Sequence, residues 1–71
     1  MEFRNITRTI MRLRDAADNA ESHTARAAYE RAIESLKWAA REPDLYRHHI
    51  ADATAQAIFA RAIEDSWRCR S

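Results

Sequence analysis

The stretch that decides the fold is Thr24-Ala25-Arg26-Ala27-Ala28-Tyr29-Glu30-Arg31-Ala32-Ile33-Glu34, which recurs 30 residues later as Thr54-Ala55-Gln56-Ala57-Ile58-Phe59-Ala60-Arg61-Ala62-Ile63-Glu64. Seven of the eleven positions are identical, and the exchange of Tyr29 for Phe59 keeps an aromatic ring. The chain has no glycine, and its single proline, Pro43, lies between the two copies. This pattern predicts two similar helices folded back on each other. Chance similarity between two helices rich in Ala, Arg and Glu is the alternative, since repeat architectures usually have three or more units.

The length of 71 residues predicts one domain, residues 1–71. In this size range a single hydrophobic core supplies only about 3–5 kcal/mol, so further support is expected. Cys69 is the only cysteine, which excludes a disulfide within the chain, and no group of Cys and His residues has the spacing of a zinc site. We therefore expect a homo-oligomer.

Apolar spacing predicts an all-α fold of three helices, at about residues 3–18, 23–41 and 43–69. In the first, alternating steps of three and four residues place one stripe on a single side: Phe3, Ile6, Ile10, Leu13, Ala17 and Ala20. Ser22 is a suitable N-cap for the second helix, although nothing in the sequence forbids a continuous helix there. Pro43 suits the first turn of the third helix. We expect the second and third helices to form an antiparallel hairpin, preceded by the amphipathic first helix, in an oligomeric bundle.

The third helix has two apolar faces. One continues the repeat and contains Ala55, Phe59, Ala62 and Ile63. The other lies roughly 120–180° from Phe59 around the helix and contains Tyr46, Ile50, Ala53 and Ala57. One helix must therefore meet two neighbours. The second face is predicted to be an oligomer interface, and the alternative is that the first helix covers it within the same chain.

The residues predict no enzyme activity and no cofactor. A chain without glycine cannot build the usual phosphate-binding loop or nucleophile elbow, and no HExxH pair is present. His48 and Asp52 have a four-residue spacing that can present two metal ligands, but further ligands are missing, so no metal site is predicted.

The N-terminal segment is the basic end of a chain whose formal net charge is only +1. Arg4, Arg8 and Arg12 follow one another at four-residue steps on the face of the first helix opposite Ile6 and Ile10, where like charges are mildly destabilising. A negatively charged ligand would relieve them. The alternative is a solvated face neutralised by Asp15 and by acids on other helices.

Trp38 is predicted to point away from the repeat stripe of its own helix. Packing on the first helix or on another subunit is one interpretation. The other is a stacking platform for a nucleotide base, formed with Tyr46 and nearby arginines.

One part of the chain resembles the helical hairpin of phage proteins that sequester cyclic-nucleotide immune signals, the anti-CBASS and anti-Thoeris sponges. The residues that carry the resemblance lie between about 12 and 40: Leu13-Arg14-Asp15-Ala16-Ala17, Ser22, Ala28-Tyr29, Arg31, Glu34, Leu36 and Trp38-Ala39. The resemblance implies stoichiometric capture of a signalling nucleotide. The polar Lys37 before Trp38 and the long third helix depart from that pattern.

A second resemblance is to the Hha/YmoA group of small nucleoid-associated modulators, which partner the H-NS protein. It rests on blocks that occur in the order of that family: Met11-Arg12-Leu13-Arg14, Glu30-Arg31-Ala32-Ile33-Glu34 with Lys37-Trp38, Ala51-Asp52 and Trp67. It implies charged helix faces that dock a partner protein and assist its DNA binding.

The leading hypothesis from the sequence is a small binding protein, a phage-type inhibitor of host defence that captures an anionic ligand such as a cyclic nucleotide. Its predicted ligand-binding residues are Arg4, Arg8, Arg12, Trp38 and Tyr46. The alternative is an Hha-like protein-interaction modulator. The expected partners are a second copy of the chain and either an anionic small molecule or a host protein, without direct sequence-specific DNA binding. No apolar run has the roughly 20 residues of a membrane span, so we expect no membrane contact and a cytoplasmic location, in the host cell if the chain is phage-encoded.

Overall fold

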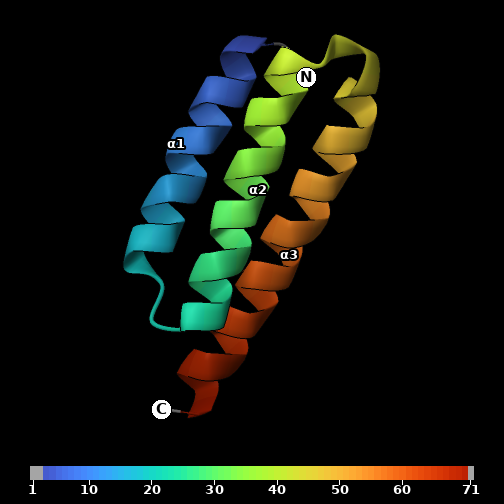
Figure 1. The fold of residues 1–71 in the computed structure, drawn as a ribbon. Coiled ribbons are helices and arrows are strands. Elements are labelled where there is room, and N and C mark those ends of the chain that lie inside the picture. The colour runs from blue at the N-terminus through green and yellow to red at the C-terminus, as the bar shows by residue number, and fades with distance from the viewer. Residues whose placement is uncertain (1–2, 71) are drawn as a thin grey trace.

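The computed structural model describes the backbone of residues 3–70 and the side chains of residues 6–70. Three α-helices follow one another along the chain, namely α1 (Phe3–Asn19), α2 (His23–Arg41) and α3 (Tyr46–Arg70), and a short 3-10 turn, η1 (Pro43–Leu45), precedes α3 (Figure 1). No strand occurs within residues 3–70. The predicted all-α fold with three helices is confirmed.

The start of α3 differs from the prediction by one turn. Residues 43–45 form the 3-10 turn η1, which begins with Pro43, and the α-helix begins at Tyr46. Proline fixes its own φ at a helical value but has no N–H to donate, so a tight first turn costs no hydrogen bond there.

The break between α1 and α2 falls at Ser22, the N-cap that the sequence predicted. Ser22 has an extended backbone (φ −84°, ψ 127°), and its hydroxyl accepts a hydrogen bond from the N–H of Ala25 at 3.3 Å. This contact satisfies one of the free donors at the start of α2, which is what an N-cap does. Ser22 therefore separates two helices that the sequence left open to being continuous.

The helices run up and down as neighbours, and α2 contacts both α1 and α3 (Figure 1). Two clusters of buried side chains hold them together. The cluster near the α1–α2 loop contains Ala17, Ala20, Ala25, Ala28, Tyr29 and Ala60. The cluster toward the other end contains Ile6, Ala32, Leu36, Ala39 and Ala53. Alanine dominates both, so the core depends on close approach of the helix backbones rather than on large side chains.

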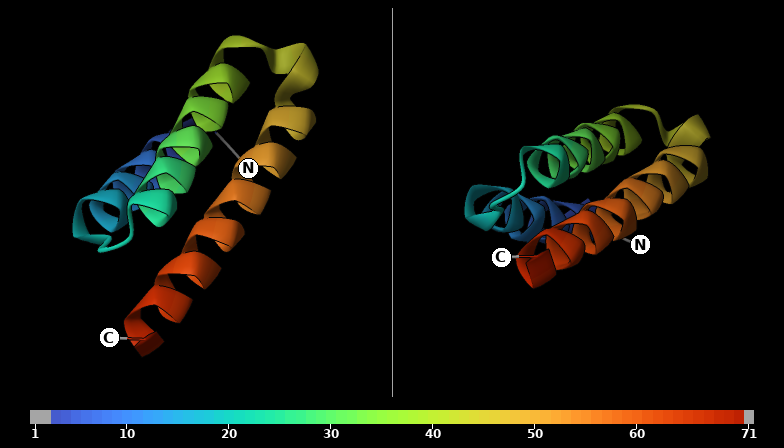
Figure 2. Two further views of the ribbon diagram at one scale, coloured as in Figure 1. Left: turned by 60° about the horizontal axis from the view of Figure 1, so that its bottom comes forward. Right: turned by 90° about the horizontal axis from the view of Figure 1, so that it is seen from below.

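At 25 residues α3 is the longest helix, and its last turns continue past the α1–α2 loop (Figure 2). The structure is correspondingly elongated, with extents of 42 × 18 × 15 Å. Trp67 lies in this overhang and is 49% exposed. Because α1 and α2 have already ended at that level, the third helix has fewer neighbours along its length than the second.

Candidate binding surfaces

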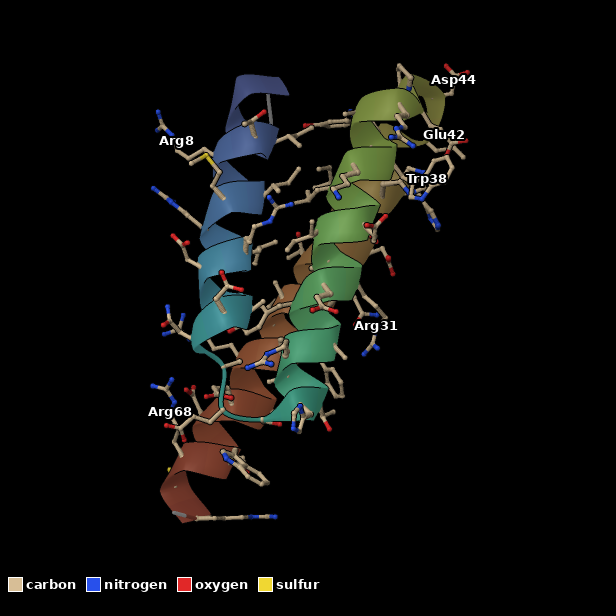
Figure 3. All side chains as sticks on the ribbon, turned by 60° about the vertical axis from the view of Figure 1, so that its left-hand side comes forward. Arg8, Arg31, Trp38, Glu42, Asp44 and Arg68 are labelled. Atoms are coloured by element: carbon tan, nitrogen blue, oxygen red, sulfur yellow. The ribbon has the colours of Figure 1, made fainter. Side chains whose placement is uncertain are left out.

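The arginine face of α1, formed by Arg8 and Arg12, lies opposite the buried Ile6. Both side chains are exposed, and Arg8 points away from α2 (Figure 3). Within residues 6–70 neither arginine makes an ion pair or a side-chain hydrogen bond, so Asp15 does not neutralise them. The side chain of Arg4 lies outside the described residues.

Met11 lies on the same outward side of α1 and is 63% exposed. The arginine face therefore combines two guanidinium groups with an apolar side chain. Arginine and methionine are enriched in protein interfaces, where they supply charge and adaptable apolar contact.

The aromatic residues of the predicted ligand site do not meet these arginines. Trp38 is 48% exposed, and the guanidinium carbon of Arg41 lies 5.8 Å from its ring centroid. Arg8 and Trp38 project from opposite sides of the bundle (Figure 3). Tyr46 is partly buried against the cluster that contains Leu36. The predicted grouping of arginines and aromatic rings is therefore not assembled within one chain.

The face of α3 that was predicted to be an oligomer interface packs within the chain. Ala53 is only 3% exposed, and Tyr46, Ile50 and Ala57 are partly buried against the same cluster, to which α1 contributes Ile6. The assignment of Ala53 to a surface between subunits is wrong, because a residue so enclosed cannot contact a second copy. The within-chain alternative describes this face.

The opposite face of α3 is instead the exposed one. An uncharged row of exposed residues follows it at three- and four-residue steps, and we name this row the outer stripe: Ala51, Ala55, Ile58, Phe59, Ala62 and Ser66. Ile58 is 66% exposed and Phe59 is 50% exposed. The sequence identified part of this row as the repeat stripe but expected a neighbour to cover it. Of that stripe, only Ile63 packs against the core.

Beside the outer stripe, an apolar hollow of about 330 Å³ runs toward the end of α3. Its walls are Phe59, Ala62, Ile63, Ser66, Trp67 and Arg70. It is shallow and built from one helix, so it extends the outer stripe rather than forming an enclosed ligand site.

A second hollow, of about 410 Å³, lies between α1 and α2. Arg14 and Lys37 line it together with three acids, Asp18, Glu30 and Glu34. The acids outnumber the bases, so this hollow does not favour an anion.

Within residues 3–70 no group of three or more His, Cys, Asp or Glu side chains could hold a metal ion. Asp52 accepts a hydrogen bond from the hydroxyl of Ser35.

One buried acid, Glu64, holds α3 to the α1–α2 loop. Its carboxylate accepts hydrogen bonds from the backbone N–H of Glu21 at 2.9 Å and of Ser22 at 3.0 Å. Arg68 donates to the same carboxylate at 2.8 Å and reaches the carbonyl of Asn19, beside the loop (Figure 3). The two backbone donors, helped by Arg68, hold the pKa of Glu64 below its ordinary value even though desolvation opposes them.

The chain matches no family model, no curated protein and no solved structure. No helix within the described residues is both long and apolar enough to cross a lipid bilayer.

Proposed function

We propose that the protein acts by binding, without catalysing a reaction, and that the arginine face of α1 docks an acidic surface of a partner protein. The observation that carries this proposal is the pair Arg8 and Arg12, which are exposed and unpaired within residues 6–70. Like charges four residues apart on a helix cost a few tenths of a kcal/mol. An acidic partner would offset that cost and gain charge-assisted hydrogen bonds.

The shape of this face favours a macromolecule over a small ligand. The arginines lie on the convex outer side of a single helix, and the hollows beside α2 and α3 have other linings. A small molecule is normally held in a concave site that buries most of its surface. An extended acidic surface, by contrast, can contact Arg8, Met11 and Arg12 together. This supports the protein-interaction modulator, the Hha-like alternative, over a nucleotide sponge.

Capture of an anionic ligand such as a cyclic nucleotide, as in a phage-type inhibitor of host defence, is the second candidate. One observation favours it: Trp38 is half exposed and has the guanidinium of Arg41 5.8 Å from its ring centroid. An exposed indole can stack on a base, and a neighbouring arginine can hold a phosphate.

The test compares Arg8→Glu with Arg47→Glu, which changes the net charge equally at an exposed position on α3. Binding of poly-L-glutamate, as a probe of an acidic protein surface, is measured at low salt by titration. We expect Arg8→Glu to weaken binding at least about tenfold, because it reverses a charge on the docking face. Arg47→Glu should leave the affinity within about twofold, and Arg8→Glu should melt at or slightly above the wild-type temperature, since a like-charge contact is relieved.

Equal losses for the two variants would contradict a dedicated arginine face. A separate titration with a cyclic dinucleotide addresses the second candidate. Stoichiometric binding that is lost in Trp38→Ala and kept in Arg8→Glu would favour nucleotide capture instead.

A further inference from the structure

We propose that the outer stripe of α3 is the interface of an antiparallel homodimer. The proposal concerns a different surface from the arginine face of α1 and does not depend on the proposed function. The sequence predicted the oligomer interface on the face of α3 around Ala53, and this proposal places it on the opposite face of the same helix.

The first reason is the chemistry of the stripe. No charged residue occurs on it between Ala51 and Ser66, although a solvated helix face usually carries charges. Charged residues border it on both sides, with Arg61 and Asp65 on one side and Asp52 on the other. The structure describes no segment of the chain that covers this face, since all six side chains are exposed. An uncharged exposed face of this length is typical of a contact surface.

The second reason is the total exposed area. The chain exposes 5215 Å², whereas a monomeric protein of 8.3 kDa is expected to expose about 4,600 Å². The excess of about 600 Å² is close to the roughly 800 Å² that each partner contributes to a standard interface. A second copy on α3 would bring the chain to the exposure expected of its mass.

The third reason is the order of residue sizes along the stripe, which suits a second copy. The large Ile58 and Phe59 are at its centre, and small residues lie on both sides. A two-fold axis between positions 58 and 59 sets Ile58 against Phe59 of the second copy and Ala55 against Ala62. A two-fold contact requires such self-complementarity, because residue i meets residue j while j meets i.

The antiparallel direction follows from the helix dipoles and from the order of residue sizes. The aligned dipoles of two parallel helices would repel at their ends. The antiparallel arrangement removes this cost and places position 48 near position 69 of the second copy.

The experiment is sedimentation equilibrium on the full chain, comparing the wild type with Ala62→Asp and Ala40→Asp. Ala40 is an exposed alanine on α2 outside the stripe, so it controls for the same substitution. We expect a wild-type dimer, a dimer at least about tenfold weaker in Ala62→Asp because a carboxylate would be desolvated, and no change in Ala40→Asp. Circular dichroism should show equal helicity in all three. A wild-type monomer at the highest soluble concentration would overturn the proposal, as would equal weakening by both variants.

The direction is tested with a short bis-maleimide crosslinker. Cys69 is the only thiol of the wild type, so His48→Cys creates the pair that an antiparallel dimer brings together, and Arg12→Cys adds a thiol on α1 as the control. Crosslinked dimer should form in His48→Cys and not in the other two. Efficient crosslinking of the wild type through Cys69 alone would show a parallel dimer and overturn the antiparallel arrangement. Arg8→Glu should leave the dimer intact, so a failure of the proposed function would be distinguishable.

Discussion

The two copies of the repeat have nearly the same residues and opposite surroundings. In α2, Tyr29 is 9% exposed and Ala32 is completely buried, whereas their counterparts in α3, Phe59 and Ala62, are both exposed. The same stripe is therefore core in one helix and surface in the other. Sequence identity within a repeat predicts a common secondary structure but not a common burial.

The difference comes from the number of neighbours. The second helix lies against both α1 and α3, so its repeat stripe has helices to pack on. The third helix turns its other face, with Ala53 and Ala60, toward the bundle. A helix with apolar residues on two sides can bury either face, and in this chain the structure covers the face with Ala53 and leaves the face with Phe59 exposed.

The largest expected difference is between the free energies of unfolding of Ala32→Asp and Ala62→Asp. An unpaired carboxylate at the buried Ala32 costs about 3–5 kcal/mol, which equals the whole stability expected of so small a core. Ala32→Asp should therefore be mostly unfolded at 25 °C. Ala62→Asp should lose less than about 1 kcal/mol as a monomer, because the new side chain remains in water. Circular dichroism at low concentration measures both, and equal unfolding of the two variants would show that the exposed stripe is core after all.

An intermediate difference in the free energy of unfolding is expected between substitutions of Tyr29 and of its counterpart in the second copy, Phe59. Tyr29→Leu should lower the free energy of unfolding by about 1–2 kcal/mol, because the buried ring loses its packing. Phe59→Leu should change it by less than about 0.5 kcal/mol in the dilute protein. Urea denaturation gives both values, and a larger loss at Phe59 would reverse the comparison between the two copies.

The smallest effect at neutral pH concerns the last residue of each copy. Glu34 is exposed and forms a surface pair with Lys37 at 3.5 Å, whereas Glu64 is buried against two backbone donors. Glu64→Gln should lower the melting temperature moderately, since the amide oxygen can still accept a hydrogen bond. Glu34→Gln should have the same melting temperature as the wild type.

The pH dependence sharpens this last prediction. Because folding lowers the pKa of Glu64 from 4.5, the stabilisation by its ionised form is complete above pH 4.5 and is lost as the pH falls through the lowered value. The melting temperatures of the wild type and of Glu64→Gln should therefore converge in acid, while Glu34→Gln follows the wild type throughout. A constant difference between the wild type and Glu64→Gln at all pH values would contradict the role of the carboxylate charge.

The sequence alone did not predict most of the arrangement of the candidate binding surfaces. The periodicity correctly placed Arg8 on the outer side of α1, because helical geometry alone sets which side is opposite Ile6. It could not decide that Trp38 and Arg8 diverge, since that depends on how α1 and α2 are rotated about each other. Glu64 was missed because its partners, the N–H groups of Glu21 and Ser22, are more than 40 residues away in the chain.

The sequence by itself predicted three helices and most of their ends, although it left open whether the first two are continuous and placed the start of α3 one turn early. Local causes are sufficient for this: apolar periodicity, the Ser22 N-cap, the turn at Pro43 and the absence of glycine. Only the tertiary structure decided which face of α3 is buried, because both faces are apolar and the choice depends on contacts with α1 and α2. That choice left the outer stripe exposed and made Ala53 part of the core.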